Sequence, residues 1–192
     1  MKTADGFQQS YNAQAAVEVD SRLIVGERVT TAPNDKQELP ATVAAIAPAA
    51  GPVAAILVDN GFYSEQAVQK VEQTAEGAPT GTTVYAAMDK TSHHRSVADL
   101  EKKPEPEAPP PRASVAEKMR YRLTSAAGKK LYKLRQQTVE PVSGIIKSAM
   151  GFRQFLTRGL NNVSTEWTLV CLAYNLRRLH TLKQTPQSTV AG

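Results

Sequence analysis

The sequence has a single cysteine, Cys171, among its 192 residues. One cysteine cannot form an intrachain disulfide, and it excludes a zinc site built from several cysteines. Long hydrophobic runs are also absent, since none approaches the roughly 20 residues that span a bilayer. The first residues contain no apolar stretch of the kind that forms a secretory signal. These absences lead us to expect a cytoplasmic protein with no membrane segment.

Acidic residues are scarce in the C-terminal part of the sequence. Residues 118–192 contain 13 Lys and Arg but only Glu140 and Glu166, a net charge of +11, whereas residues 1–117 have a net charge of −6. A strongly basic region favours a polyanionic partner, with nucleic acid first among the candidates. The alternative is a solvated helical surface that is rich in lysine and binds no polyanion.

Two stretches near the start of the sequence alternate between apolar and polar residues. Residues 11–19 and 23–30 each follow the two-residue period of a strand with one solvated face, and Asp20 and Ser21 between them favour a turn. We therefore expect an antiparallel hairpin.

A strand, a helix and a second strand are expected next. Residues 53–58 are an unbroken apolar run, which is typical of a parallel strand buried on both faces. Ser64 is placed to cap the helix that follows, and residues 82–88 have the composition of another strand. The hairpin and this βαβ unit together predict an α/β fold with a mixed sheet.

The composition changes at about residue 90. Residues 90–116 include a proline-rich stretch that favours an extended, disordered linker. Residues 117–183 have helical periodicity and carry most of the basic residues, and residues 184–192 read as a flexible tail. The expected organisation is therefore a sheet region at 1–89, the linker, the basic helical part and the tail.

Two carboxylates are candidate site residues. Asp59 follows the predicted buried strand, and α/β proteins place their sites at the carboxyl ends of parallel strands. Glu140 lies in a basic helical stretch, with Thr138 as a candidate N-cap and Lys147 two turns further along the same face. A carboxylate among cations suits metal-assisted phosphoryl transfer. The alternatives are a turn-forming Asp and a Glu favoured by the helix dipole.

Several separated motifs carry a resemblance to a known family. They are Gly6-Phe7-Gln8-Gln9-Ser10-Tyr11-Asn12-Ala13-Gln14, Asn34-Asp35-Lys36, Val58-Asp59-Asn60-Gly61-Phe62-Tyr63-Ser64, Tyr132 with Arg135, Glu140 with Lys147, Gly151-Phe152-Arg153 and Asn175-Leu176-Arg177-Arg178-Leu179. In this order they resemble the C-terminal two-thirds of a DDE-type bacterial insertion-sequence transposase with a ribonuclease H-like catalytic domain.

The resemblance implies a function and a set of site residues. Family members use three carboxylates to bind two divalent metal ions, Mg²⁺ or Mn²⁺, and they cleave and join DNA at the element ends and at the target. By resemblance Asp59 and Glu140 are catalytic and metal-binding, and Tyr132, Arg135 and Lys147 contact DNA. Arg135 departs from the family pattern, because four residues rather than three separate it from Glu140.

The family's first aspartate has no counterpart in this sequence. The resemblance therefore implies an incomplete ribonuclease H-like sheet, weak metal binding and a truncated transposase that is inactive alone. The alternative is a basic DNA-binding remnant without chemistry, which would interfere with an intact transposase. DNA is the expected partner in both cases, with a homo-oligomer or an intact transposase as the expected protein partner.

Overall fold

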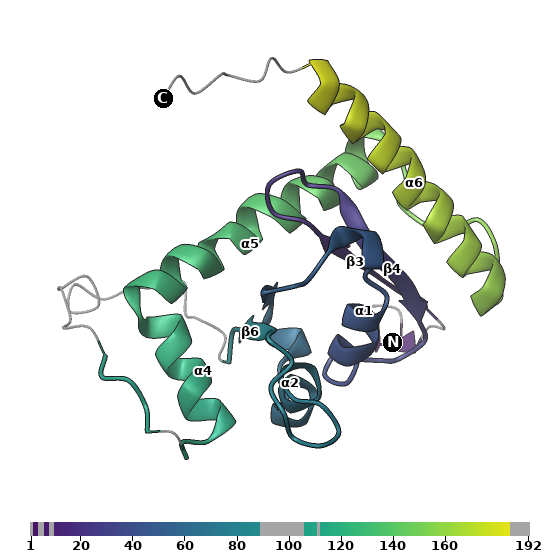
Figure 1. The fold of residues 1–192 in the computed structure, drawn as a ribbon. Helices are drawn as coiled ribbons and strands as arrows, with labels where there is room; N and C mark the ends of the chain where they lie inside the picture. Colours follow the sequence, from purple (N-terminus) through teal and green to yellow (C-terminus); the bar gives the residue numbers. More distant parts are fainter. Residues whose placement is uncertain (1, 4–5, 8–9, 89–105, 111, 185–192) are drawn as a thin grey trace, which may run out of the picture. The chain divides into compact units, whose positions relative to one another are not determined.

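The computed structural model describes residues 2–3, 6–7, 10–88, 106–110 and 112–184 (Figure 1). The chain divides into two compact units. Unit 1 comprises Met1–Pro33, Thr42–Ala50 and Gln136–Gly192, and unit 2 comprises Asn34–Ala41 and Gly51–Arg135. Most of the predicted linker and nearly all of the predicted tail lie outside the described residues, so the predicted domain boundaries stay a prediction.

Unit 1 contains the expected hairpin. Strand β3 (Asn12–Val17) pairs antiparallel with β4 (Ile24–Thr30), which confirms this part of the sequence interpretation. Arg22 adopts a positive φ of 57° in the connection. The short strands β1 (Lys2–Thr3) and β2 (Gly6–Phe7) form a second antiparallel pair.

Helix α6 (Leu160–Gln184) packs on β4 and completes the core of unit 1. Trp167 and Tyr174 are buried on this face of the helix. The Trp167 indole N–H donates to the Gln14 carbonyl at 2.9 Å, and the Tyr174 hydroxyl donates to the Arg22 carbonyl at 2.9 Å. Each aromatic side chain therefore adds a hydrogen bond to the area that it buries.

The amide of Asn175 fixes the helix to the first residue of β4. Its Oδ1 accepts from the Ile24 N–H and its Nδ2 donates to the Ile24 carbonyl, both at 2.8 Å. One turn further on, Arg178 Nε donates to the Ser21 carbonyl at 2.7 Å. These polar contacts determine which face of α6 lies against the hairpin.

Unit 2 contains the expected βαβ element. Strand β5 (Ala55–Val58) and strand β6 (Thr83–Ala86) pair in parallel, and helix α2 (Glu65–Glu72) connects them. Ser64 is the N-cap of α2, because its hydroxyl accepts from the Ala67 N–H at 3.2 Å. The helix buries Val68 and Val71.

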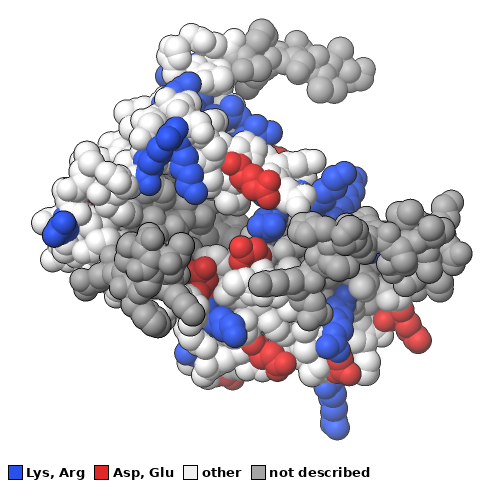
Figure 2. Space-filling view, turned by 180° about the vertical axis from the view of Figure 1, so that it is seen from behind, with Lys and Arg blue, Asp and Glu red and all other residues white. Residues whose placement is uncertain are grey.

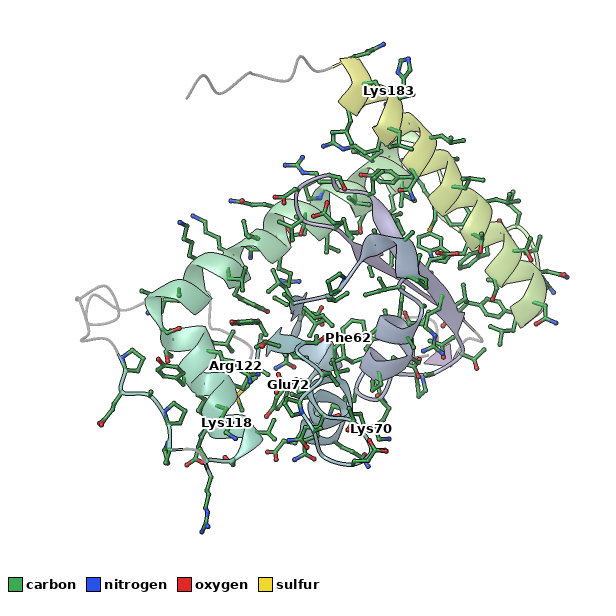
Figure 3. All side chains as sticks on the ribbon, in the orientation of Figure 1. Phe62, Lys70, Glu72, Lys118, Arg122 and Lys183 are labelled. Carbon is green, nitrogen blue, oxygen red and sulfur yellow. The ribbon has the colours of Figure 1, made fainter. Side chains whose placement is uncertain are left out.

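Helix α4 (Val115–Thr124) joins α2 and β6 through an ion pair. The Arg122 guanidinium donates two hydrogen bonds to the Glu72 carboxylate and a third, at 3.0 Å, to the Val84 carbonyl (Figure 3). Glu72 Oε1 in turn accepts from the Val84 N–H at 2.8 Å. Val84, Glu72 and Arg122 thus satisfy one another's hydrogen-bonding groups beside the small apolar core.

Helix α5 (Ala126–Gly144) continues into a π-helical segment, Ile145–Ala149. The expectation that Thr138 starts a helix is wrong: Thr138 is buried inside α5, and Pro141 also lies within the helix. Proline interrupts a helical hydrogen bond. The helix nevertheless passes through this position, and Val142 and Ile146 beyond it are buried in the core of unit 1. Their burial offsets the cost of the proline.

An α/β fold that contains both antiparallel and parallel strand pairs is confirmed. The described strands form separate two-stranded sheets, however, and not one mixed sheet. Strand β4 instead forms hydrogen bonds with the segment that follows α1 (Leu39–Ala44). Ile46 forms an antiparallel bridge with Gly26, and the Ala47 N–H donates to the Val25 carbonyl at 2.7 Å. The ribonuclease H-like topology stays a prediction.

The burial of β5 also differs from the expectation. Ala55 is exposed and the other three residues of the strand are only half-buried. Helices α2 and α4 pack on β6, where Val84 and Ala86 are fully buried. An apolar run thus forms the less covered strand of the pair.

Candidate catalytic and nucleic-acid site

Asp59 lies directly after β5, at the carboxyl end of the parallel pair. It is the N-cap of a short 3₁₀ turn, Asn60–Phe62, and its Oδ1 accepts from the Gly61 N–H at 2.9 Å. Its side chain is exposed. The turn therefore orients the carboxylate while leaving it open to a ligand.

A second carboxylate, that of Asp35, also lies close to Gly61. A Cβ atom added to Gly61 would be 3.1 Å from Asp59 Oδ1 and 3.5 Å from Asp35 Oδ2. Ser64 holds the same segment in place, since its hydroxyl donates to the Lys36 carbonyl at 2.8 Å. Asp35 is named from the sequence only as part of the motif Asn34-Asp35-Lys36 and not as a candidate site residue.

Tyr132 of α5 reaches the end of β5. Its hydroxyl donates to the carbonyl of Val58, the residue before Asp59, at 2.9 Å. Burial raises the pKa of the Tyr132 phenol; the Arg135 guanidinium opposes this rise, and the negative charge of Asp59 adds to it. The guanidinium carbon of Arg135 lies 5.8 Å from the centre of the Tyr132 ring, within cation–π range. Asp59, Tyr132 and Arg135 are therefore brought together within unit 2.

Glu140 and Lys147 belong to unit 1. Both side chains are exposed, Glu140 near the end of α5 and Lys147 in the π-helical segment. A π-helix has wider turns than an α-helix, so the simple two-turn argument for a shared face does not apply here. Since Asp59 belongs to unit 2, its expected meeting with Glu140 stays a prediction.

No group of three or more His, Cys, Asp or Glu side chains that could hold a metal ion occurs within the described residues. Every helix in the described part of the chain is too short or too polar to span a membrane. Lys and Arg side chains share the surface with Asp and Glu on the face drawn in Figure 2.

The geometry of unit 2 is suited to a class of site that handles metal ions and phosphates. It places an exposed carboxylate at the end of a parallel strand, with a tyrosine and an arginine beside it. Carboxylate oxygens are hard ligands for divalent cations, and guanidinium groups bind phosphate oxygens.

Comparison with known protein families gives a match over part of the chain. Residues 95–180 match the family model described as Transposase DDE domain, which confirms the resemblance over this segment and supports a transposase family for the chain. The matched segment contains Tyr132, Arg135, Glu140 and Lys147, whereas Asp59 lies before it. No curated protein and no solved structure matches the chain.

Proposed function

We propose that this chain carries part of the catalytic site of a DDE transposase, with Asp59 and Glu140 as metal-binding carboxylates and Tyr132, Arg135 and Lys147 as DNA-binding residues. One observation carries the proposal. The family match covers the last four of these residues, and Tyr132, within the match, hydrogen-bonds to the residue that precedes Asp59.

The chemistry of the two acids fits the metal ions that such a reaction uses. Both are exposed carboxylates, and oxygen ligands of this kind are what Mg²⁺ and Mn²⁺ prefer. When bound, such an ion polarises a phosphoryl oxygen and lowers the pKa of a coordinated water. In this site Arg135 and Lys147 bind DNA phosphates, and Tyr132 both contacts DNA and positions the Asp59 turn through its hydrogen bond to Val58.

The proposal includes an incomplete site. Family members use three carboxylates, and by resemblance Asp59 and Glu140 correspond to two of them. Mg²⁺ demands near-octahedral oxygen coordination, so two carboxylates bind it weakly. The polypeptide alone then neither cleaves nor joins DNA.

A metal titration with matched variants tests the roles of the acids. The wild-type chain, Asp59→Asn, Glu140→Gln and Glu166→Gln are titrated with Mn²⁺, and free Mn²⁺ is followed by electron paramagnetic resonance. Glu166→Gln is the control, because Glu166 is the other acid of the basic region and caps a loop through Leu156 and Thr157. We expect Asp59→Asn and Glu140→Gln each to weaken Mn²⁺ binding about tenfold. Equal affinity in all four proteins would contradict the assignment.

An activity assay tests the predicted inactivity. The purified chain is incubated with Mg²⁺ or Mn²⁺ and supercoiled plasmid carrying the DNA that flanks its gene. We expect no nicking or strand transfer above that of the Asp59→Asn variant. Metal-dependent strand transfer that Asp59→Asn abolishes would show that the site is complete.

A second function, DNA binding without chemistry, is favoured by the net charge of +11 on residues 118–192. Binding dominated by phosphate contacts weakens steeply with salt. Fluorescence anisotropy with a labelled duplex should show this loss between low and physiological salt. Lys147→Ala should reduce the salt slope by about one, whereas Lys70→Ala, on α2, should leave it unchanged. Salt-independent binding would exclude this function.

A further inference from the structure

Helix α6 has a second apolar face that the fold of unit 1 does not bury. Leu169, Leu172, Leu176 and Leu179 are 60%, 52%, 60% and 42% exposed. Their spacing of three, four and three residues is the a/d spacing of a coiled-coil heptad. These four residues are called the leucine seam.

Helix α6 cannot rotate to bury the leucine seam against the hairpin, because another face of the helix already packs there. Trp167 and Tyr174 are seven residues apart and buried against the hairpin, at the heptad position opposite the a/d seam. The bidentate amide contact of Asn175 with Ile24 fixes this rotation of the helix. The hairpin therefore holds α6 in place while the four leucines of the seam stay exposed.

We propose that the leucine seam is a dimerisation surface that pairs with the same seam of a second copy of this chain in antiparallel orientation. Leucine at successive a and d positions is self-complementary, because each side chain inserts between those of an equivalent helix. Segments 89–105 and 185–192 of the same chain are poor candidates to cover it, since together they contain one leucine and no isoleucine, phenylalanine or methionine.

Charge determines the orientation. Glu166 is the one acidic residue of α6 and lies toward its N-terminal end, whereas Arg177, Arg178 and Lys183 lie toward its C-terminal end. A parallel pair would place these basic ends side by side. An antiparallel pair brings the basic end of each helix toward the end that carries Glu166 in the other, and it also opposes the two helix dipoles.

The seam is short, so we expect a weak dimer. Residues 169–179 span about 15 Å of helix at the usual rise of 1.5 Å per residue. An isolated helix of this length is marginal in water. Here packing on the hairpin has already formed the helix, so association does not have to supply that free energy.

Sedimentation equilibrium tests the proposal with two matched double variants. Leu172→Gln/Leu176→Gln removes the centre of the seam. Leu156→Gln/Leu160→Gln removes two other exposed leucines, 83% and 44% exposed, that lie off the seam. Far-UV circular dichroism checks that both keep the wild-type helix content.

We expect the average mass of the wild type and of the off-seam variant to rise toward that of a dimer between about 1 and about 100 µM. The seam variant should stay monomeric over this range. A wild type that stays monomeric, or a seam variant that associates like the wild type, would overturn the proposal. Because no DNA or metal is present, failure here leaves the proposed transposase function untouched.

Cysteine cross-linking tests the orientation. Ala173 is exposed and lies between Leu172 and Leu176, so an antiparallel pair places it beside its own copy. Lys183 lies at the end of the helix (Figure 3). It would meet its own copy only in a parallel pair. On mild oxidation we expect Ala173→Cys to form a disulfide-linked dimer and Lys183→Cys to remain unlinked, with the buried Cys171 inert in both. The reverse result would exclude the antiparallel arrangement.

Discussion

Unit 1 contains a network of aromatic rings, whereas unit 2 is organised around one ion pair. In unit 1, Tyr11, Phe152, Phe155 and Trp167 contact one another with ring centres 5.3–6.4 Å apart. The apolar core of unit 2 consists of small side chains together with Met119 and Leu39, with Glu72 and Arg122 at its margin. One unit is thus held mainly by buried apolar area and the other by a polar network, so changes of charge and of volume should affect them differently.

The largest effect should come from Trp167, the buried member of the aromatic network. Trp167→Ala removes the buried ring and should lower the free energy of unfolding by about 3–5 kcal/mol. Urea denaturation followed by far-UV circular dichroism measures this change. Trp167→Phe is the matched variant: it keeps an aromatic ring but leaves the Gln14 carbonyl without the indole N–H, and it should cost about 1–2 kcal/mol. Equal losses in the two variants would show that packing contributes little.

Cys171 reports on the same core. Burial raises the pKa of its thiol to about 12, so little of it is the reactive thiolate near neutral pH. Reaction with a thiol reagent should be slow in the wild type and faster in Trp167→Ala, where the core opens more often. Rapid labelling of the folded wild type would contradict the packing of unit 1.

An intermediate effect is expected at the ion pair of unit 2. Arg122→Met leaves the Glu72 carboxylate without its partner, and about 2 kcal/mol should be lost, since each side chain is still about one-fifth exposed. Glu72→Gln combined with Arg122→Met should cost less than the sum of the two single changes, as measured by urea denaturation in a double-mutant cycle. Arg120→Met, at an exposed position of the same helix, should change stability by at most about 0.5 kcal/mol. Additive single costs would mean that the pair is not coupled.

The smallest effect is expected at Glu166, on the surface of unit 1. Hydrogen bonds from the Thr157 hydroxyl and the Leu156 N–H hold the pKa of Glu166 below its ordinary value of 4.5. A carboxylate with a lowered pKa contributes stability that is fully present above 4.5 and is lost as the pH falls through the folded-state pKa. The melting temperature of Glu166→Gln should therefore lie slightly below that of the wild type at neutral pH and approach it on acidification. Thr157→Val removes the hydroxyl donor and should reduce this pH-dependent difference in melting temperature. A difference that grows as the pH falls would contradict a lowered pKa of Glu166.

Elements determined by local chemistry could be predicted from the sequence. The alternation of residues 11–30 predicted the hairpin, and Ser64 marked the start of α2, because strand periodicity and helix capping depend on residues close in sequence. The same local reasoning was wrong at Thr138. There the burial of Val142 and Ile146 against distant parts of unit 1 keeps α5 continuous through Pro141.

The candidate site was only partly accessible to sequence reasoning. Asp59 could be placed at the end of a strand from its neighbours alone. The hydrogen bond from Tyr132 to the preceding residue, Val58, could not be predicted, since 74 positions separate the two and the bond depends on tertiary packing. Asp35 was overlooked for a similar reason, because only the folded chain brings its carboxylate beside Gly61.

The Asn175 amide has a consequence for aggregation. By donating to and accepting from Ile24, one side chain satisfies both backbone groups of that residue, as a neighbouring strand would. Exposed strand edges recruit other chains through such unsatisfied groups. The beginning of β4 is therefore closed to further strand addition by a helix that lies more than 150 positions away in the chain, so loss of α6 would open a new edge for self-association.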